Sequence, residues 1–301
     1  MTTLSALNDR YAIAGQVTFE AEPNGLVLAK VRNPHASAQI CLQGAQVIQW
    51  APLNEHPVIW LSKAAKFMPG KSVRGGVPVC WPWFGPHASD TRFPAHGYAR
   101  TVEWDVIETA ALADGRTLLV FRLRESAPTR EQWPHDTPLE CRITVGDTLE
   151  IELSTKNNTD STVTITEALH TYFEIGDIGK VSIAGLEDTE YLDKVDGGQR
   201  KLQHGPVTIA GEVDRVYLDT RAEVFIEDLE LQRKIHISKR GSDSTVVWNP
   251  WQAKADKMGD LGEAGFRRMV CVESGNAAEN TVTIAPGEEH LLWVSYRVER
   301  D

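Results

Sequence analysis

The sequence predicts an all-β protein, a large antiparallel β-sandwich with few short helices, and three observations lead to this prediction. First, the chain contains many short runs rich in β-branched and aromatic residues, often alternating with polar residues. Second, clusters of Gly, Pro, Asn and Asp separate these runs, as turns separate strands. Third, helical patterns are confined to two short segments. Such a chain is typical of packed antiparallel sheets.

The elements are predicted in chain order as follows. Residues 3–13 favour a short amphipathic helix that begins at a Thr or Ser cap. Strand-like runs then occupy residues 25–33, 45–52, 57–62, 116–124, 139–157, 161–173, 180–186, 222–229, 233–240, 244–250, 267–274 and 280–299. Residues 249–258 favour a second short helix, started by Asn249 with Pro250 at its first position.

Two tight connections join neighbouring runs. Gly146-Asp147 lies between two alternating segments and predicts a β-hairpin. Pro286-Gly287 predicts a second bend. The chain shows no internal repeat, low-complexity linker or compositional break. We therefore expect residues 1–301 to form a single domain.

Composition and charge exclude several classes of protein. The chain has 301 residues and a net charge of -11, which disfavours general binding to nucleic acids or to anionic membrane surfaces. No apolar stretch is long enough to span a bilayer, and the N-terminal residues lack the pattern of a signal peptide. We expect a cytoplasmic protein and a monomer.

Four scattered cysteines show no pairing or metal-binding pattern. They are Cys41, Cys80, Cys141 and Cys271, and none belongs to a Cys-x-x-Cys pair or has His at metal-ligand spacing. We expect reduced, mostly buried thiols and no metal site.

The segment "KSVRGGVPVCWPWFGPH", residues 71–87, is the most unusual in the chain. Two prolines in an apolar run do not suit a central strand, so a rigid loop is expected. Gly75 and Gly76 would let the backbone approach a ligand closely. Alternatively, the loop only covers the core with its aromatic residues, and the local sequence leaves both interpretations open.

Two arginines lie in irregular segments rich in glycine and aromatic residues. Arg74 precedes the glycine pair, and Arg100 closes "FPAHGYAR", which also contains His96. A single arginine is usually a solvated surface charge. Two guanidinium groups on stiff loops are what a phosphate site in an acidic protein requires.

A histidine and a glutamate are candidates for acid–base chemistry. His170 lies in "TVTITEALHTYF", which predicts a strand, and Glu273 is predicted to end the apolar strand in "MVCVESG". Each residue alone is more often structural than catalytic. Together with the two arginines, and without a metal pattern, the pair suits proton transfer on a neutral or anionic small molecule.

These segments resemble the glucose-6-phosphate 1-epimerase (hexose-6-phosphate mutarotase) family, in the galactose mutarotase-like β-sandwich superfamily. The resemblance is carried, in the family's order, by "RGGVPVCWPWFG", "AHGYAR", "ALHTYFEIGDI", "EVDRVY", "VVWNPWQAKADKMGDLG" and "MVCVESGN". It covers most of the chain and implies a sandwich of the galactose mutarotase-like type.

The resemblance also implies roles for six residues. His170 and Glu273 match the family's catalytic histidine and glutamate, and Arg74, His96, Arg100 and Asp214 match positions that contact phosphate and sugar. The chain departs from the family pattern at Ser274, where Pro is frequent, and at Gly265-Phe266, where Glu-Tyr is frequent. Neither change removes a charged group that the chemistry needs.

The implied activity is the interconversion of the α and β anomers of glucose 6-phosphate and related hexose 6-phosphates, without metal or other cofactor. Two alternatives remain open at this point. A non-catalytic sugar-phosphate-binding or regulatory protein could use the same scaffold. An aldose 1-epimerase for unphosphorylated sugars would leave two cations without an anionic partner.

Overall fold

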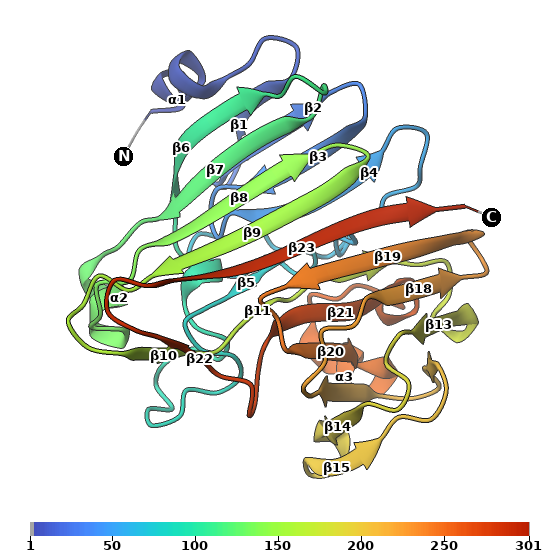
Figure 1. Ribbon diagram of the computed structural model, residues 1–301. Helices are drawn as coiled ribbons and strands as arrows, with labels where there is room; N and C mark the ends of the chain where they lie inside the picture. The colour runs from blue at the N-terminus through green and yellow to red at the C-terminus, as the bar shows by residue number, and fades with distance from the viewer. Residues whose placement is uncertain (1–2, 301) are drawn as a thin grey trace.

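Antiparallel strands in four sheets form most of the molecule, in a computed structural model that describes residues 3–300 (Figure 1). The largest sheet has nine strands in the order β16-β13-β18-β19-β23-β9-β8-β7-β6. An eight-stranded sheet has the order β15-β14-β17-β20-β21-β11-β5, and β12 also pairs with β21. The smaller sheets are β1-β2-β3-β4 and β10-β22. The predicted all-β class is confirmed.

The strands and helices have the following bounds. The strands are β1 Val17–Ala21, β2 Val27–Arg32, β3 Ala36–Cys41, β4 Gln46–Pro52, β5 Val79–Cys80, β6 Trp104–Ala111, β7 Thr117–Leu123, β8 Leu139–Val145, β9 Thr148–Lys156, β10 Val163–Ile165, β11 Glu167–Leu169, β12 Tyr172–Glu174, β13 Val181–Ala184, β14 Glu190–Asp193, β15 Gln199–Leu202, β16 Val207–Thr208, β17 Val213–Tyr217, β18 Val224–Asp228, β19 Arg233–Arg240, β20 Ser244–Asn249, β21 Met269–Asn276, β22 Val282–Ile284 and β23 Glu289–Glu299. The helices are α1 Leu4–Tyr11, α2 Ala127–Gln132 and α3 Trp251–Met258, with 3-10 turns η1 Ala99–Thr101, η2 Ile178–Lys180, η3 Lys194–Asp196 and η4 Gly265–Arg268.

The first predicted helix is confirmed, and the second begins later than expected. Helix α1 is capped by Thr3, whose hydroxyl accepts a hydrogen bond from the Ala6 amide. Helix α3 begins at Trp251, with Pro250 as its cap. Asn249 is the last residue of β20 instead of the helix start, and its side-chain oxygen accepts from the Trp251 amide. The pairing of Asn249 with Val213 of β17 keeps Asn249 extended.

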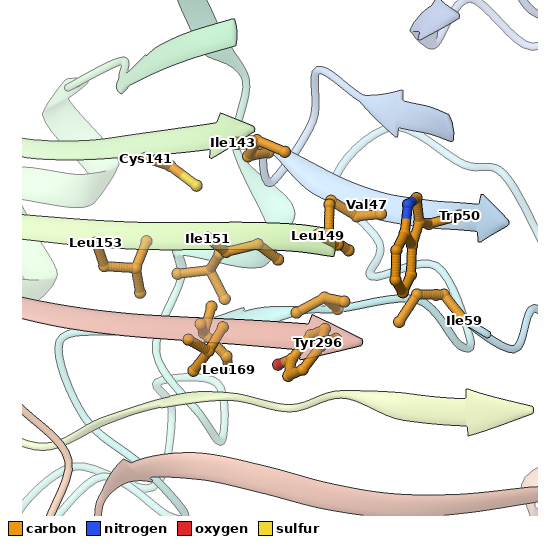
Figure 2. Close-up of a cluster of buried hydrophobic side chains, with 14 of the residues drawn as sticks. Val47, Trp50, Ile59, Cys141, Ile143, Leu149, Ile151, Leu153, Leu169 and Tyr296 are labelled. Atoms are coloured by element: carbon orange, nitrogen blue, oxygen red, sulfur yellow. The ribbon is translucent and has the colours of Figure 1, made fainter. Parts of the chain in front are cut away.

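The main core lies under the inner face of the nine-stranded sheet. Strands β8 and β9 alternate between buried and partly exposed positions, as the sequence predicted, and join in the hairpin at Gly146-Asp147. Figure 2 shows Leu149 and Ile151 of β9 and Tyr296 of β23 facing Trp50 of β4 and Leu169 of β11. The four-stranded and eight-stranded sheets therefore cover the same face of the large sheet.

The middle strands of the eight-stranded sheet are buried on both faces. Every residue of β20 and β21 is buried. Val247, Val270 and Val272 belong to the main core, whereas Trp248 and Cys271 belong to a second apolar cluster beside α3. Because side chains alternate across a strand, this sheet has a second covered face, and the candidate site lies there.

Two further expectations concern cysteines and membranes. All four thiols are buried and free, as predicted. None of the helices in residues 3–300 combines the length and hydrophobicity that crossing a bilayer requires.

Candidate active site

A pocket of about 610 Å³ lies on the second face of the eight-stranded sheet. All six residues implied by the sequence border this one pocket, namely Arg74, His96, Arg100, His170, Asp214 and Glu273. They come from segments far apart in the chain. The pocket volume is in the range typical of small-molecule sites.

Strand alternation places Glu273 on the pocket face. Cys271 and Glu273 share one face of β21, while Val272 between them points into the main core. Glu273 is only 1% exposed. It lies inside β21 rather than at the strand end that was predicted, because the paired backbone continues to Asn276.

His170 lies in a break between strands, and the prediction of a continuous strand through residues 161–173 is wrong. Strand β11 ends at Leu169 and β12 begins at Tyr172. The His170 amide donates to the Pro78 carbonyl over 3.0 Å, and the Tyr172 amide donates to Gly76 over 2.9 Å. The backbone of residues 76–78 therefore holds His170 in place at the break.

The imidazole and the carboxylate face each other. His170 Nδ1 lies 3.3 Å from Glu273 Oε1, yet His170 Nδ1 and Glu273 Oε2 are buried without a hydrogen-bond partner among residues 3–300. Buried polar atoms are normally satisfied. Both atoms border the pocket and therefore need a hydrogen-bond partner from inside it, either water or a ligand.

Burial shifts the pKa values of both groups toward their neutral forms. The pKa of His170 falls well below its usual value, through burial first and then through its neighbours His96, Arg100 and Arg74. The pKa of Glu273 rises well above its usual value, through burial and the nearby Asp214, against an opposing effect of Arg100. Neutral imidazole and neutral carboxyl are therefore the favoured forms of the pair in the free protein.

Aromatic rings fix the plane of the His170 imidazole. The Tyr172 ring is stacked on it, with ring centroids 5.0 Å apart and planes 8° apart. Trp60 stacks on Tyr172 at 5.9 Å, and Trp248 meets His170 edge-on at 5.9 Å. Sequence analysis did not identify Tyr172 or Trp248, although both lie inside the motifs that carried the resemblance.

Arg74 is already partnered by protein groups. Its Nε lies 3.1 Å from Asp260 Oδ1, and its Nη1 donates to the Tyr172 hydroxyl over 2.9 Å. The glycines after Arg74 have another role than predicted: they approach protein backbone rather than a ligand. A Cβ atom added at Gly75 would lie 2.6 Å from the carbonyl oxygen of Trp60. A Cβ atom added at Gly76 would lie 2.4 Å from the carbonyl oxygen of Val47.

The second arginine and His96 come from a segment packed against residues 81–85. Arg100 Nη2 donates to the Ala95 carbonyl over 2.9 Å. His96 takes a left-handed backbone conformation, with φ of 66°, and its ring centroid lies 5.8 Å from that of His170. Burial, with a smaller effect of Arg100, lowers the pKa of His96 to about 3. His96 is therefore neutral near pH 7.

Asp214 projects from β17 into the same pocket, with two lysines that the sequence did not indicate. Burial raises the pKa of Asp214, and the charges of Lys254 and Lys194 oppose this rise. Both lysines border the pocket, and Lys254 Nζ lies 2.8 Å from Glu212. Lys254 lies in the segment "VVWNPWQAKADKMGDLG" that carried the resemblance, whereas Lys194, in η3, lies in none of these segments.

One group of side chains in the pocket region has atoms of the kinds that bind metal ions. The ligand-type atoms of His170, Cys271 and Glu273 all lie within 4.8 Å of one another. The expected absence of a metal thus remains a prediction.

The chain is similar to known proteins over most of its length. Residues 28–297 match the family described as Aldose 1-epimerase. A protein of Escherichia coli (strain K12), named "Putative glucose-6-phosphate 1-epimerase", is 40% identical over 267 residues, which cover 88% of each chain. A protein of Cenchrus ciliaris with the same name is 36% identical over 279 residues, 89% of this chain and 83% of the relative.

Solved structures include close structural relatives. The crystal structure of a "putative mutarotase" from Salmonella typhimurium superposes with a TM-score of 0.89 and 35% identity, covering 95% of this chain and 94% of that one. A galactose mutarotase-like protein from Clostridium acetobutylicum superposes with a TM-score of 0.71 at 14% identity and covers 95% of this chain and 98% of its own, which shows the shared fold. The predicted galactose mutarotase-like architecture is confirmed.

Proposed function

The chain belongs to the aldose 1-epimerase family, whose activity is the interconversion of sugar anomers, and we propose that its substrate is glucose 6-phosphate. Related hexose 6-phosphates are included in the proposal. Three features support it: the names of relatives that cover most of the chain, the acid–base pair, and the cations beside that pair.

The observation that carries the proposal is the shared pocket. His170 and Glu273 lie 3.3 Å apart, and Arg74 and Arg100 border the same cavity. In a pyranose, the ring oxygen O5 and the hydroxyl oxygen O1 are both bonded to C1. Two proton-transferring groups that act on these atoms must therefore lie close together.

Ring opening requires two proton transfers. Imidazolium at His170 gives its proton to O5 while the carboxylate of Glu273 takes the proton of the O1 hydroxyl. The C1–O5 bond breaks and an aldehyde forms. After rotation about C1–C2, the ring closes on the other face, and the two protons return to the groups that held them.

The two arginines that border the pocket suit a phosphate on C6. C6 is bonded to C5, which is bonded to O5, so the phosphate emerges beside the ring oxygen on which His170 acts. Arg74 and Arg100 are both near enough to lower the pKa of His170. They would bind and orient the phosphate rather than break bonds.

One observation favours a second candidate, a mutarotase for unphosphorylated aldoses. Arg74 pairs with Asp260, and Arg100 donates to a carbonyl. Both arginines therefore keep protein partners when the bound sugar is neutral. The sequence had led us to expect that a neutral sugar would leave the two cations without a partner. A non-catalytic binding protein is disfavoured because the close pair of His170 and Glu273 has no role in binding alone.

Anomer exchange measured by NMR on glucose and glucose 6-phosphate, side by side, tests the proposal. We expect the enzyme to accelerate exchange of both sugars and to favour the phosphate by kcat/KM. Equal kcat/KM values would support the unphosphorylated substrate, and no acceleration of either would support a binding protein.

A further inference from the structure

Arg74 is joined to His170 by direct contacts through Tyr172. Arg74 donates to the Tyr172 hydroxyl, and the Tyr172 ring lies parallel to the imidazole. With Nε at Asp260 and Nη1 at Tyr172, Nη2 is the Arg74 nitrogen without a hydrogen-bond partner in residues 3–300. An anion at Nη2 therefore touches a chain of contacts that ends at the catalytic imidazole.

The groups facing His170 are mostly cationic or neutral. Arg74 and Arg100 bring positive charge, and His96 is neutral near pH 7. On β21, Glu273 and Cys271 face the imidazole. Positive charges beside the ring disfavour a further positive charge on it. Glu273, Asp214 across the pocket and a backbone hydrogen bond of His170 are the groups that favour imidazolium in the free protein.

We propose that the dianionic phosphate of the substrate activates the acid–base pair in addition to anchoring the sugar, by moving the shared proton from Glu273 to His170. This inference rests on the proposed function and assigns Tyr172 as a positioning residue between phosphate and acid.

A pair that shares one proton has a neutral arrangement, carboxyl and imidazole, and a charged arrangement, carboxylate and imidazolium. Burial favours the neutral arrangement. Two negative charges at Arg74 favour imidazolium, because Arg74 contacts the imidazole through Tyr172 and acts on the pKa of His170, whereas the charges that act on the pKa of Glu273 are those of Asp214 and Arg100. The charged arrangement is the one that opens the ring, and ring opening converts it to the neutral one without loss of a proton.

Phosphite is the probe, because it is a dianion that lacks the sugar. The measurement is NMR anomer exchange of glucose by the wild-type protein, with phosphite or with sodium chloride at the same ionic strength. The rate in each buffer without protein is subtracted, because such anions also catalyse the reaction in solution. We expect phosphite to accelerate the enzymatic exchange roughly tenfold, which corresponds to one pKa unit in the proton affinity of the acid.

Variants test the path of the effect through the ratio of rates with and without phosphite. We expect this ratio to fall to one in Arg74→Ala. In Tyr172→Phe, which keeps the stacked ring but loses the hydroxyl, we expect the ratio to fall severalfold. Tyr217→Phe is the matched control. It removes another buried hydroxyl, which donates to Gln203 over 2.7 Å outside the pocket, and should keep the wild-type ratio.

A direct spectroscopic measurement follows the imidazole itself. The ¹⁵N signals of His170, identified by their absence in His170→Gln, should move toward imidazolium on addition of phosphite and should not move in Arg74→Ala.

The outcomes separate this inference from the proposed function. If glucose 6-phosphate is favoured but phosphite has no effect on glucose exchange or on the imidazole signals, phosphate only anchors the sugar and the inference is wrong. Acceleration that persists unchanged in Arg74→Ala also contradicts it. If neither sugar is exchanged, the proposed function falls and the inference falls with it.

Discussion

The residues of the pocket are arranged so that charge is costly where the chemistry requires it. Glu273 is 1% exposed and has one oxygen without a partner among residues 3–300, and His170 is surrounded by rings and arginines. An unpaired buried charge costs several kcal/mol. Burial therefore favours the neutral arrangement in the free protein, and the proposal above assigns the shift to the charged arrangement to the bound substrate.

Removal of either member of the pair should abolish most of the catalysed exchange. General acid–base groups typically contribute about 10²–10⁴-fold, so we expect losses of this order for His170→Ala and Glu273→Gln in NMR exchange of glucose 6-phosphate. Unchanged far-UV circular dichroism would show that the fold is retained. Near-normal exchange in either variant would refute its assigned role.

The matched control for these variants lies outside the pocket. His236→Ala removes a histidine that contacts Glu223 and Glu299 on the large sheet. It should leave exchange at the wild-type rate.

The arginines should discriminate between phosphorylated and free sugar. A charge-assisted contact contributes about 1.5–3 kcal/mol, so Arg100→Ala and Arg74→Ala should weaken glucose 6-phosphate roughly ten- to a hundredfold and glucose much less. Lys at either position should recover only part of the loss, because it lacks the planar fork. KM and Kd measurements for both sugars test this, with Arg122→Ala on the large sheet as control.

Equal weakening of both sugars would show that the arginines act on the ring or on the fold. Arg100→Ala is the cleaner variant, since Arg74→Ala also leaves Asp260 and the Tyr172 hydroxyl without their partner.

Removal of metal should have no effect on activity. The proposed steps are proton transfers between two side chains and the sugar, so dialysis against a chelator should leave exchange of glucose 6-phosphate unchanged. Loss of activity that added zinc restores would instead assign His170, Cys271 and Glu273 as metal ligands.

Sequence could indicate the charged residues of this site but not all of their partners. His170, Glu273 and the arginines stand out because polar groups in apolar or glycine-rich segments need a reason to be there. Asp260 and Lys194 do not stand out, since an acid and a lysine in polar surroundings are ordinary. Their position in the pocket depends on which distant segments the fold brings together, and local sequence patterns do not predict such contacts.

At the scale of elements, the segment that carries His96 and Arg100 depends on close backbone packing. Gly97 has φ of 68°, and a Cβ atom there would lie 1.9 Å from the Trp81 carbonyl oxygen. Residues 81 and 97 form a parallel bridge. We therefore expect a side chain at Gly97 to displace the segment that carries His96 and Arg100.

Gly97→Ala should destabilise the protein and weaken substrate binding together. Alanine at a positive φ costs about 1 kcal/mol, and the clash with the backbone of Trp81 adds to this cost. Gly287→Ala separates the two effects, because Gly287 has φ of 79° but a Cβ atom there would meet no neighbouring atom within 4 Å. Urea unfolding and exchange kinetics of both variants provide the measurement. Similar results for the two would mean that packing at Trp81 is unimportant.

Elements with regular alternation could be predicted, and interrupted ones could not. Strands β8 and β9 show the pattern clearly. The break at His170 is invisible in "TVTITEALHTYF", because it depends on a hydrogen bond to Pro78, which lies far earlier in the chain. Several strands were missed, among them β1, β6 and β17. The misses at β3 and β15 have a simple reason, because these strands contain few β-branched residues and owe their conformation to their neighbours.

At the scale of the whole molecule, we propose that the chain is a single domain. One buried cluster contains residues from Leu7 to Tyr296 and draws on all four sheets. We therefore expect one cooperative thermal transition, with the same midpoint by tryptophan fluorescence and by far-UV circular dichroism. Two separated transitions would show that the sheets unfold independently.

The position of β23 has a consequence for synthesis on the ribosome. This strand, Glu289–Glu299, lies between β9 and β19 in the large sheet, although β9 ends at Lys156. At roughly 5–20 residues per second, about 7 to 27 seconds separate the emergence of β9 from that of its partner. During this time one edge of β9 has no strand beside it, and exposed strand edges invite pairing with other chains. The unpaired edge of β9 in the nascent chain therefore has to be shielded until β23 is synthesised. Mutations that slow translation of the last third of the chain should lower the soluble yield more than their effect on the stability of the folded protein would suggest.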